Sequence, residues 1–223
     1  MGAYSSTQIL ASIQSGSLVC IPFASHQAQD DALLLTLGSY YYRTRQDYPA
    51  AVHNPLDVNN LEQYFEGPFR ALEHQSQCIQ AGIRPMSGLS EQHPVILLRP
   101  NDRLVAHSHE FVSLPADHVA ELHELPQWRQ SGILIHRNFA HVSSVTRLSI
   151  TIHNTNSQQS VLLPVGTPIA QLVVIGTPTE ASPPSDGNAV DAAIATWTPG
   201  SMLAQPWPTP IRPPANIQGL HYA

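Results

Sequence analysis

Hydrophobic positions near the N-terminus repeat with helical spacing. Ile9 and Ile13 lie four residues apart, Ser5 can cap the first turn, and Gly16 can end the last one. This pattern predicts one short helix over residues 5–15. The two apolar runs that follow, LVCIPF and ALLLTLGSYYYR, are rich in branched and aromatic residues and predict strands instead.

The middle of the chain loses this apolar character. Residues 44–93 are mostly polar, and helical spacing is suggested only in the stretch LEQYFEGPFRALEHQSQCI. We therefore predict an insertion over residues 44–93 that carries a helix near this stretch.

Short apolar runs at close spacing return between residues 95 and 175. Pro, Gly and Asn separate them, which is typical of several short strands joined by tight turns. This pattern predicts a mainly β barrel or jelly roll. The runs are VILLRP, RLVAH, FVSLP, GILIH, RLSITIHN, SVLLPV and IAQLVVI.

The last segment, residues 176–223, holds nine prolines and two tryptophans and shows few strand signals. We expect an arm that follows a β domain over residues 1–175. Two interpretations stay open: a flexible Pro-rich linker that binds a partner module, or an arm that docks Trp197 and Trp207 on its own or a neighbouring subunit.

Composition narrows the class of protein. The chain has 223 residues, of which 42% are hydrophobic, and this is enough for one sizeable core in a soluble protein. The net charge is -6, lysine is absent and the ten arginines form no basic cluster, which argues against a nucleic-acid partner. No apolar run reaches membrane-spanning length and no signal peptide is visible, so we expect no membrane partner and a cytoplasmic protein in which Cys20 and Cys78 are reduced, buried thiols.

Four stretches, taken in order, resemble the dCTP deaminase and dUTPase superfamily, in particular its deaminase branch. They are SSTQILASIQSGSLVCIPF, ALLLTLGSYYYR, LLRPNDRLVAHSHEFVSLP and LLPVGTPIAQLVV. The last is the most specific, because Pro164 and Gly166 match the family's Pro-x-Gly turn and Gln171 matches a glutamine that contacts the nucleotide. The resemblance covers about residues 5–43 and 96–175. It implies a dUTPase-like distorted jelly-roll barrel with a short N-terminal helix and a helical insertion, assembled as a homotrimer with sites between subunits.

The family's catalytic carboxylates have no counterpart here. Ser143 stands where the resemblance places the Asp that binds the sugar, and Thr151 stands where deaminases carry the Glu that acts as general acid and base. From residue 125 to residue 179 the sequence contains neither Asp nor Glu. Deamination needs a group that moves protons between water and the ring, and an unaided hydroxyl is far too weak an acid and base for that task.

The phosphate-binding segment of the family also departs from its pattern. Its arginines and first serine fall on Leu125, Gln130 and Pro126 in the stretch LPQWRQSG, and only Arg129 lies nearby. A triphosphate carries about four negative charges and needs fixed cations or a metal clamp. We therefore expect a fold that is retained and a standard chemistry that is lost.

Histidines could supply another function, because His107, His109, His136, His141 and His153 all lie in the predicted barrel. His107 and His109 are two apart on a strand and are expected to share a face, as a metal pair or a proton relay would require. The Glu that a cupin-type metal site needs is missing, since Ser113 and Leu114 occupy its spacing, and we expect neither metal nor cofactor. Ordinary polar surface is the alternative role for these histidines.

The stretch AHVSSVTRLSITIHNT alternates, and this places Thr151 and His153 on one face, about 7 Å apart. With Ser143, His136 and His141 they could line a pocket for a neutral or weakly polar small molecule. A plain core strand is the alternative interpretation.

Three hypotheses for function remain. The first is a diverged trimer that uses the inter-subunit pocket for a different small molecule, as a repurposed enzyme or a binder. The second is an active dCTP deaminase or dUTP diphosphatase with relocated catalytic groups. The third is a non-catalytic structural or regulatory trimer.

Overall fold

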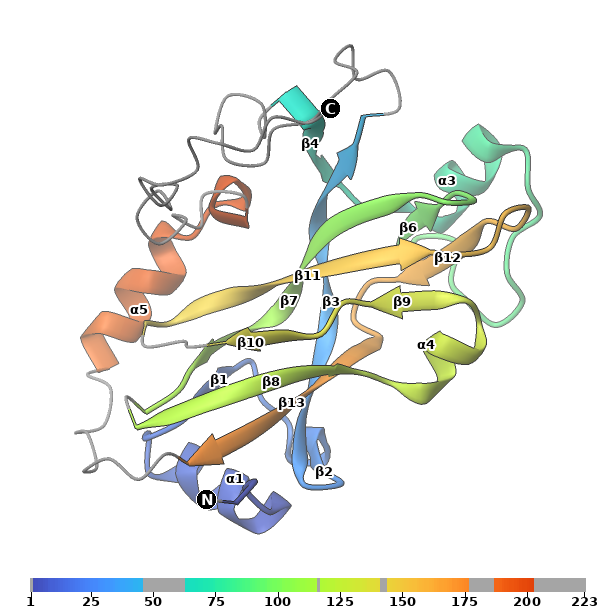
Figure 1. Ribbon diagram of the computed structural model, residues 1–223. Coiled ribbons are helices and arrows are strands. Elements are labelled where there is room, and N and C mark those ends of the chain that lie inside the picture. The colour runs from blue at the N-terminus through green and yellow to red at the C-terminus, as the bar shows by residue number, and fades with distance from the viewer. Residues whose placement is uncertain (1, 46–62, 116, 141–143, 177–186, 203–223) are drawn as a thin grey trace, which may run out of the picture.

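The computed structural model describes residues 2–45, 63–115, 117–140, 144–176 and 187–202. Within them the chain is mainly β, as predicted, and one large, nearly closed sheet wraps around the core (Figure 1). The helices, in chain order, are α1 (Ser6–Gln14), η1 (Ser25–Gln27), α3 (His74–Ala81), α4 (Pro126–Gln130), α5 (Gly187–Thr196) and η2 (Pro199–Met202).

The large sheet has ten strands, and its main path runs β10-β8-β13-β3-β7-β11-β9. Strand β1 pairs with β7, β2 and β4 pair with β3, and a smaller sheet has the order β12-β6-β5. The strands are β1 (Val19–Ile21), β2 (Ala28–Gln29), β3 (Ala32–Thr44), β4 (Phe65–Arg70), β5 (Leu72–Glu73), β6 (Pro94–Leu98), β7 (Arg103–Ser113), β8 (His118–Glu124), β9 (Ile133–Ile135), β10 (Asn138–Ala140), β11 (Thr146–Asn154), β12 (Val161–Pro164) and β13 (Pro168–Gly176).

The predicted N-terminal helix is confirmed as α1. The Ser5 side chain accepts a hydrogen bond from the backbone N–H of Gln8, and the Gln8 side chain accepts one from the backbone N–H of Ser5, which forms a capping box. Ile9 is buried in the core beneath it. The helix therefore begins next to a residue that can cap it, and its apolar face packs against the core.

The helix predicted in the insertion lies later than expected. The stretch from residue 61 to residue 79 contains strand β4 before helix α3 begins at His74. Gly67 has a positive φ of 133° and is followed by Pro68, and both residues interrupt a helix. These two residues explain why the first half of the stretch is extended.

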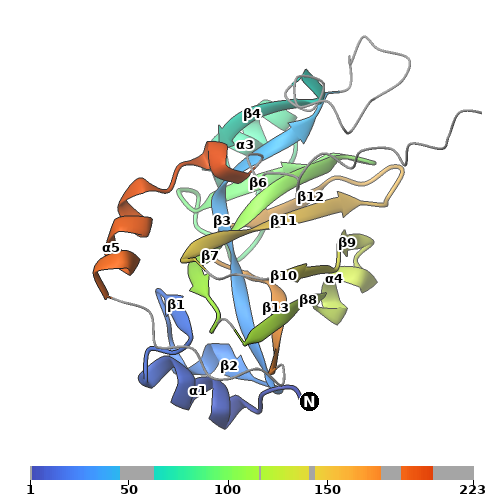
Figure 2. The same ribbon diagram turned by 60° about the vertical axis from the view of Figure 1, so that its left-hand side comes forward.

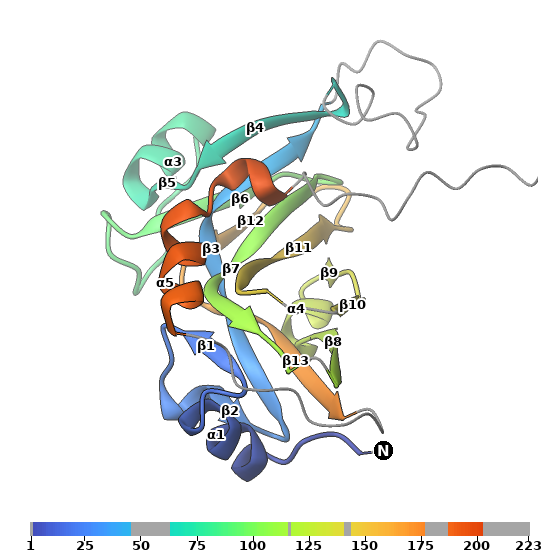
Figure 3. The same cartoon turned by 90° about the vertical axis from the view of Figure 1, so that its left-hand side faces the viewer.

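Helices α4 and α5 were not predicted from the sequence. Helix α4 is only five residues long and starts with Pro126, which is well suited to a first helical turn. Helix α5 lies in the segment expected to be an arm, and Figures 2 and 3 show it running from near β1 toward β4. No helix in the described part of the chain is both long and apolar enough to cross a membrane.

The expectation that His107 and His109 share a face is wrong, because β7 bulges between them. In the pairing of β7 with β11, His107 lies opposite Ser149 and Phe111 lies opposite Arg147. The same interval therefore takes more residues in β7 than in β11. The Ser108 hydroxyl fixes this bulge: it donates to the Glu110 carbonyl (2.7 Å) and accepts from the Leu148 N–H (2.8 Å). His107 is consequently fully buried and His109 is exposed.

Candidate functional site

Strand β11 has the two-faced character that the sequence predicts. Ile150 and Ile152 are fully buried in the core, while Ser149, Thr151 and His153 are half-buried on the opposite face. This alternation follows from the period-two geometry of a strand. The polar face is therefore available for chemistry, and the apolar face holds the strand in place.

Strand β9 brings a second histidine to this face. The backbone N–H of His136 donates to the carbonyl of Thr151 (3.0 Å), and His153 lies opposite Leu134 of β9 and Arg103 of β7. Burial lowers the pKa of His136 below its ordinary value, and the charges of Arg103 and His153 lower it further. The neutral imidazole of His136 is therefore favoured beside Thr151.

A carboxylate that the sequence analysis overlooked lies near this group. Glu124 ends β8, its side chain is 7% exposed, and its charge acts on His136 in the direction that raises the pKa. One oxygen of Glu124 pairs with the guanidinium of Arg129, which α4 presents. The other oxygen, Oε2, is buried and has no hydrogen-bond partner among the described residues.

Glu124 directly precedes the stretch of residues 125–179 that contains no carboxylate, so the composition of that stretch does not reveal it. The feature of the sequence that could have indicated Glu124 is its position just before α4, the short helix that carries Arg129. A buried carboxylate with an unpaired oxygen costs stability unless something else binds it. The structure thus brings Thr151, His136 and His153 together, with the Glu124–Arg129 pair beside them.

Two other predicted site residues, Gln130 and Gln171, do not join this group within one chain. Gln130 is exposed at the end of α4. Gln171 of β13 lies opposite His123, on the face away from the core, whereas Ala170 lies opposite Glu124. His141 and Ser143 lie outside the described residues.

The C-terminal arm covers the Ser149 end of the polar face. The Ser149 hydroxyl donates to the carbonyl of Met202 (3.2 Å). The Trp197 ring lies 4.8 Å from the His107 ring and 4.6 Å from the guanidinium carbon of Arg147. Trp197 therefore docks on its own chain, with a cation–π contact to Arg147, and Trp207 lies outside the described residues.

The buried carboxylate of Glu110 is already hydrogen-bonded. Glu110 is 1% exposed and accepts hydrogen bonds from the Gln27 amide, the Thr36 N–H and the Thr36 hydroxyl. Burial, together with the Glu110 charge, raises the pKa of the Cys20 thiol to about 12, which makes it a poor nucleophile. We assign these groups to the scaffold.

Both predicted thiols, Cys20 and Cys78, are indeed buried and free. Across the described ranges, no three His, Cys, Asp or Glu side chains converge as ligands for a metal ion.

Comparison with solved structures places the fold. The chain is similar to the 2'-deoxycytidine 5'-triphosphate deaminase from Agrobacterium tumefaciens, with a TM-score of 0.52 and 16% identity over 78% of this chain and 48% of that one. It thus spans about half the length of that relative. A mutant dUTPase from phage phi11 of S. aureus gives a TM-score of 0.35 and 17% identity over 42% of this chain and 79% of that one. The likeness to the deaminase concerns the fold alone.

No curated protein matches the sequence. A family model described as dCTP deaminase-like, however, matches residues 3–177. The match includes the strands and helices around Thr151 and extends over most of the chain. On this evidence the protein belongs to the dCTP deaminase-like family.

Proposed function

We propose that the protein is a homotrimer that no longer deaminates dCTP or hydrolyses dUTP, and that it uses the site around Thr151 for a different small molecule, as a binder or as an enzyme. The observation that supports this most is the composition of the β9 and β11 face. It offers the Thr151 hydroxyl and the imidazoles of His136 and His153, and neither strand carries a carboxylate.

Charge supports the same proposal. Arg103 and Arg129 are the cations beside this group, and Glu124 already neutralises Arg129. A triphosphate carries about four negative charges, and the pairing of Arg129 with Glu124 weakens the clamp that it would need. Hydroxyl and imidazole groups suit a neutral or weakly polar ligand better. In the proposed trimer a neighbouring subunit would complete the site.

A relocated carboxylate makes an active deaminase the second candidate. Oε2 of Glu124 is buried and unpaired, and the carboxylate lies close enough to His136 to change its pKa. A carboxylate in such a position can take a proton from water and pass it on. This candidate requires Glu124 to replace the glutamate that the family places at the position of Thr151.

Turnover of dCTP and dUTP separates the two candidates. Purified protein is incubated with each nucleotide, with and without magnesium, and products are quantified by chromatography. We expect no product at ordinary enzymatic rates of about 1 per second or more. Product that disappears in Glu124→Gln would establish the second candidate, and product that persists in this variant would overturn both.

Retention of a ligand tests the binding half of the proposal. We expect a small molecule to co-purify with the protein and to be released on denaturation, as detected by mass spectrometry. His153→Ala should lose it while the melting temperature changes by about 2 °C or less, because the His153 side chain is half-exposed and makes no hydrogen bond among the described residues. His109→Ala, an exposed histidine on β7, is the matched control. A His153→Ala variant that keeps the ligand but loses roughly 1 to 3 kcal/mol of stability would assign His153 to the scaffold.

A further inference from the structure

A pocket lies beside the insertion, and its lining includes no residue of the Thr151 group. It has a volume of about 440 Å³ and lies where α3 and the residues after it face the end of β6 and the loop between β11 and β12. Its polar lining groups are Gln77, Gln80, Arg99 and Ser160, and its apolar ones include Ile83 and Leu97. None of the described residues that line it is acidic.

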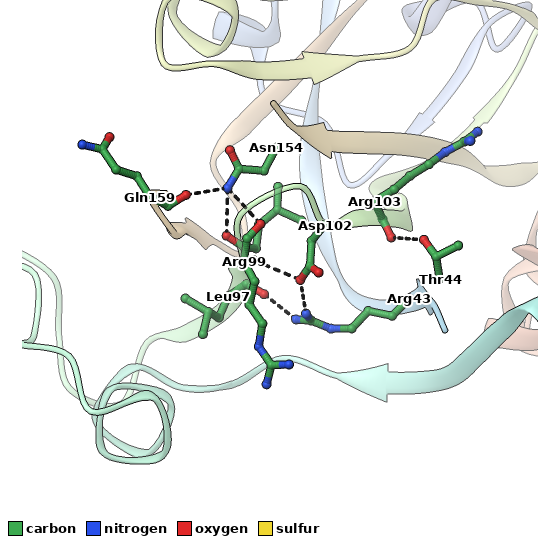
Figure 4. Close-up of polar contacts among 9 residues, drawn as sticks. Arg43, Thr44, Leu97, Arg99, Asp102, Arg103, Asn154 and Gln159 are labelled. Carbon is green, nitrogen blue, oxygen red and sulfur yellow. Dashed lines mark hydrogen bonds and ion pairs between the residues drawn. The ribbon is translucent and has the colours of Figure 1, made fainter. Parts of the chain in front are cut away.

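Arg99 places in this pocket a positive charge that forms no ion pair with any described residue. Its backbone is fixed, since its N–H donates to Asp102 Oδ2 (3.0 Å) and its carbonyl accepts from the Asn154 amide (3.0 Å). Its guanidinium forms no hydrogen bond or ion pair with any described residue. Figure 4 shows this side chain extending away from Asp102, whose carboxylate pairs with Arg43.

Gln77 brings an amide that lacks a partner. Gln77 is 8% exposed and lines the pocket, yet its side chain forms no hydrogen bond within the described part of the chain. This amide is therefore free to hydrogen-bond a ligand or water in the pocket. The amide of Gln80 and the hydroxyl of Ser160 lie in the same lining, so donors and acceptors converge on one space.

We propose that this pocket binds a small molecule that carries one carboxylate and a hydrogen-bonding body. One guanidinium matches a carboxylate in a bidentate pair, and the lack of a second cation disfavours a phosphate ester or polyphosphate. The amides of Gln77 and Gln80 suit an amide-like body, and Leu97 and Ile83 accept an aliphatic part. The volume falls in the usual range of about 300 to 1,000 Å³ for small-molecule sites. The proposal is independent of what binds near Thr151.

N-acetyl-leucine and N-acetyl-glutamine, each beside its uncharged C-terminal amide, are the probes. Binding to the full-length protein is measured by titration calorimetry or ligand-observed NMR, with inorganic phosphate as a third arm. We expect at least one acid to bind at least tenfold more tightly than its amide. Equal binding of acid and amide, or no binding of any probe, would overturn the proposal, and phosphate binding more tightly than the acids would overturn the ligand class.

Two arginine variants test whether the acids bind in this pocket. Arg99→Gln should weaken acid binding at least tenfold without lowering the melting temperature, because only the Arg99 backbone takes part in described hydrogen bonds. Arg84→Gln, an exposed arginine of the same insertion outside the pocket, should bind as the wild type does. Unchanged binding in Arg99→Gln would refute the site. Neither variant should change the response to dCTP or dUTP, which keeps this test separate from that of the Thr151 group.

Discussion

Gly38 and His107 compete for one space between β3 and β7. A side chain added at Gly38 would overlap three atoms of the His107 ring. The ring cannot easily move away, because Nδ1 donates to the Ser108 carbonyl (2.7 Å) and Nε2 accepts from the Tyr40 N–H (3.1 Å). The absence of a side chain at Gly38 is therefore what allows a histidine to be buried here.

Gly38→Ala should lower the free energy of unfolding by about 1 to 3 kcal/mol, as overpacked core positions do. Urea denaturation measures this change. Gly2→Ala, where a side chain would meet no atom within 4 Å, is the neutral control. Adding His107→Ala to Gly38→Ala should give a smaller loss than the two single losses summed, because the overlap is then relieved. A Gly38→Ala protein as stable as the wild type would show that the ring has room to shift.

Burial also makes His107 a source of pH dependence. It lowers the pKa of this imidazole from 6.5 to about 4, and the charges of Arg147 and His109 act in the same direction. Between these two pH values the unfolded chain holds a proton at His107 that the folded protein lacks. The stabilisation is therefore complete above pH 6.5 and is lost as the pH falls toward 4.

Urea denaturation at pH 7 and pH 4.5 should show a loss in the wild type to which His107 contributes at most about 3 kcal/mol. His107→Gln should lose less stability between these two pH values, because glutamine does not titrate. His109→Gln, which changes the exposed neighbour, should behave nearly as the wild type does, because burial and not the His109 charge is the main cause of the lowered pKa. An identical pH dependence in His107→Gln and wild type would remove His107 as the cause.

The face on which a side chain lies could be predicted from the sequence only where the strand is regular. Alternation in β11 correctly separated Thr151 and His153 from the buried isoleucines. The same rule failed for His107 and His109, because a bulge pinned by Ser108 changes the period and has no clear sequence signal. The charge of Glu124 acts on His136 only because separate strands come together in the fold, and the linear sequence does not show this.

At the scale of elements, predictions succeeded where apolar spacing was strong. The helix that Ser5 caps and the strands of the barrel lie close to their predicted ranges. Helix α5 has no such signal, and its place depends on tertiary contacts, above all those of Trp197 with Arg147 and His107. A ten-residue helix is marginal on its own in water, so packing determines it.

Asn154 joins three elements at the end of β11. Its amide donates to the carbonyls of Leu98, Arg99 and Gln159, and these contacts bring together β6, its turn and the loop before β12 (Figure 4). The side chain is fully buried. This amide thus reinforces a corner that the backbone hydrogen bonds from Asn154 to Asp102 and from Asn101 to Asn156 also join.

Asn154→Asp would direct a carboxylate at three carbonyl oxygens, and we expect it to cost about 3 kcal/mol or more. Thermal and urea denaturation measure the loss. Gln159→Ala is the matched control, because Gln159 takes part through its backbone carbonyl only, and it should be nearly neutral. Equal stability of the two variants would contradict a structural role for the Asn154 amide.

At the scale of the whole molecule, a single chain leaves apolar surface uncovered in one region. Of the seven exposed large hydrophobic residues in the described part of the chain, five lie between residues 69 and 86, and Ile79 is 74% exposed. Exposed apolar side chains that gather in one part of a structure often mark a contact surface. This surface lies in the insertion, where composition alone suggested only a polar segment.

We expect the protein to form a closed trimer in dilute solution, because the family resemblance places sites between subunits and the single chain exposes apolar side chains that association can bury. Light scattering coupled to size exclusion should give about 73 kDa, three times the chain mass of 24.3 kDa. Dilution to low micromolar concentration should not change this mass if the trimer is obligate, because a folded monomer would then be unstable. A stable species of 24.3 kDa would contradict the proposed trimer, because no neighbouring subunit would then complete the Thr151 group.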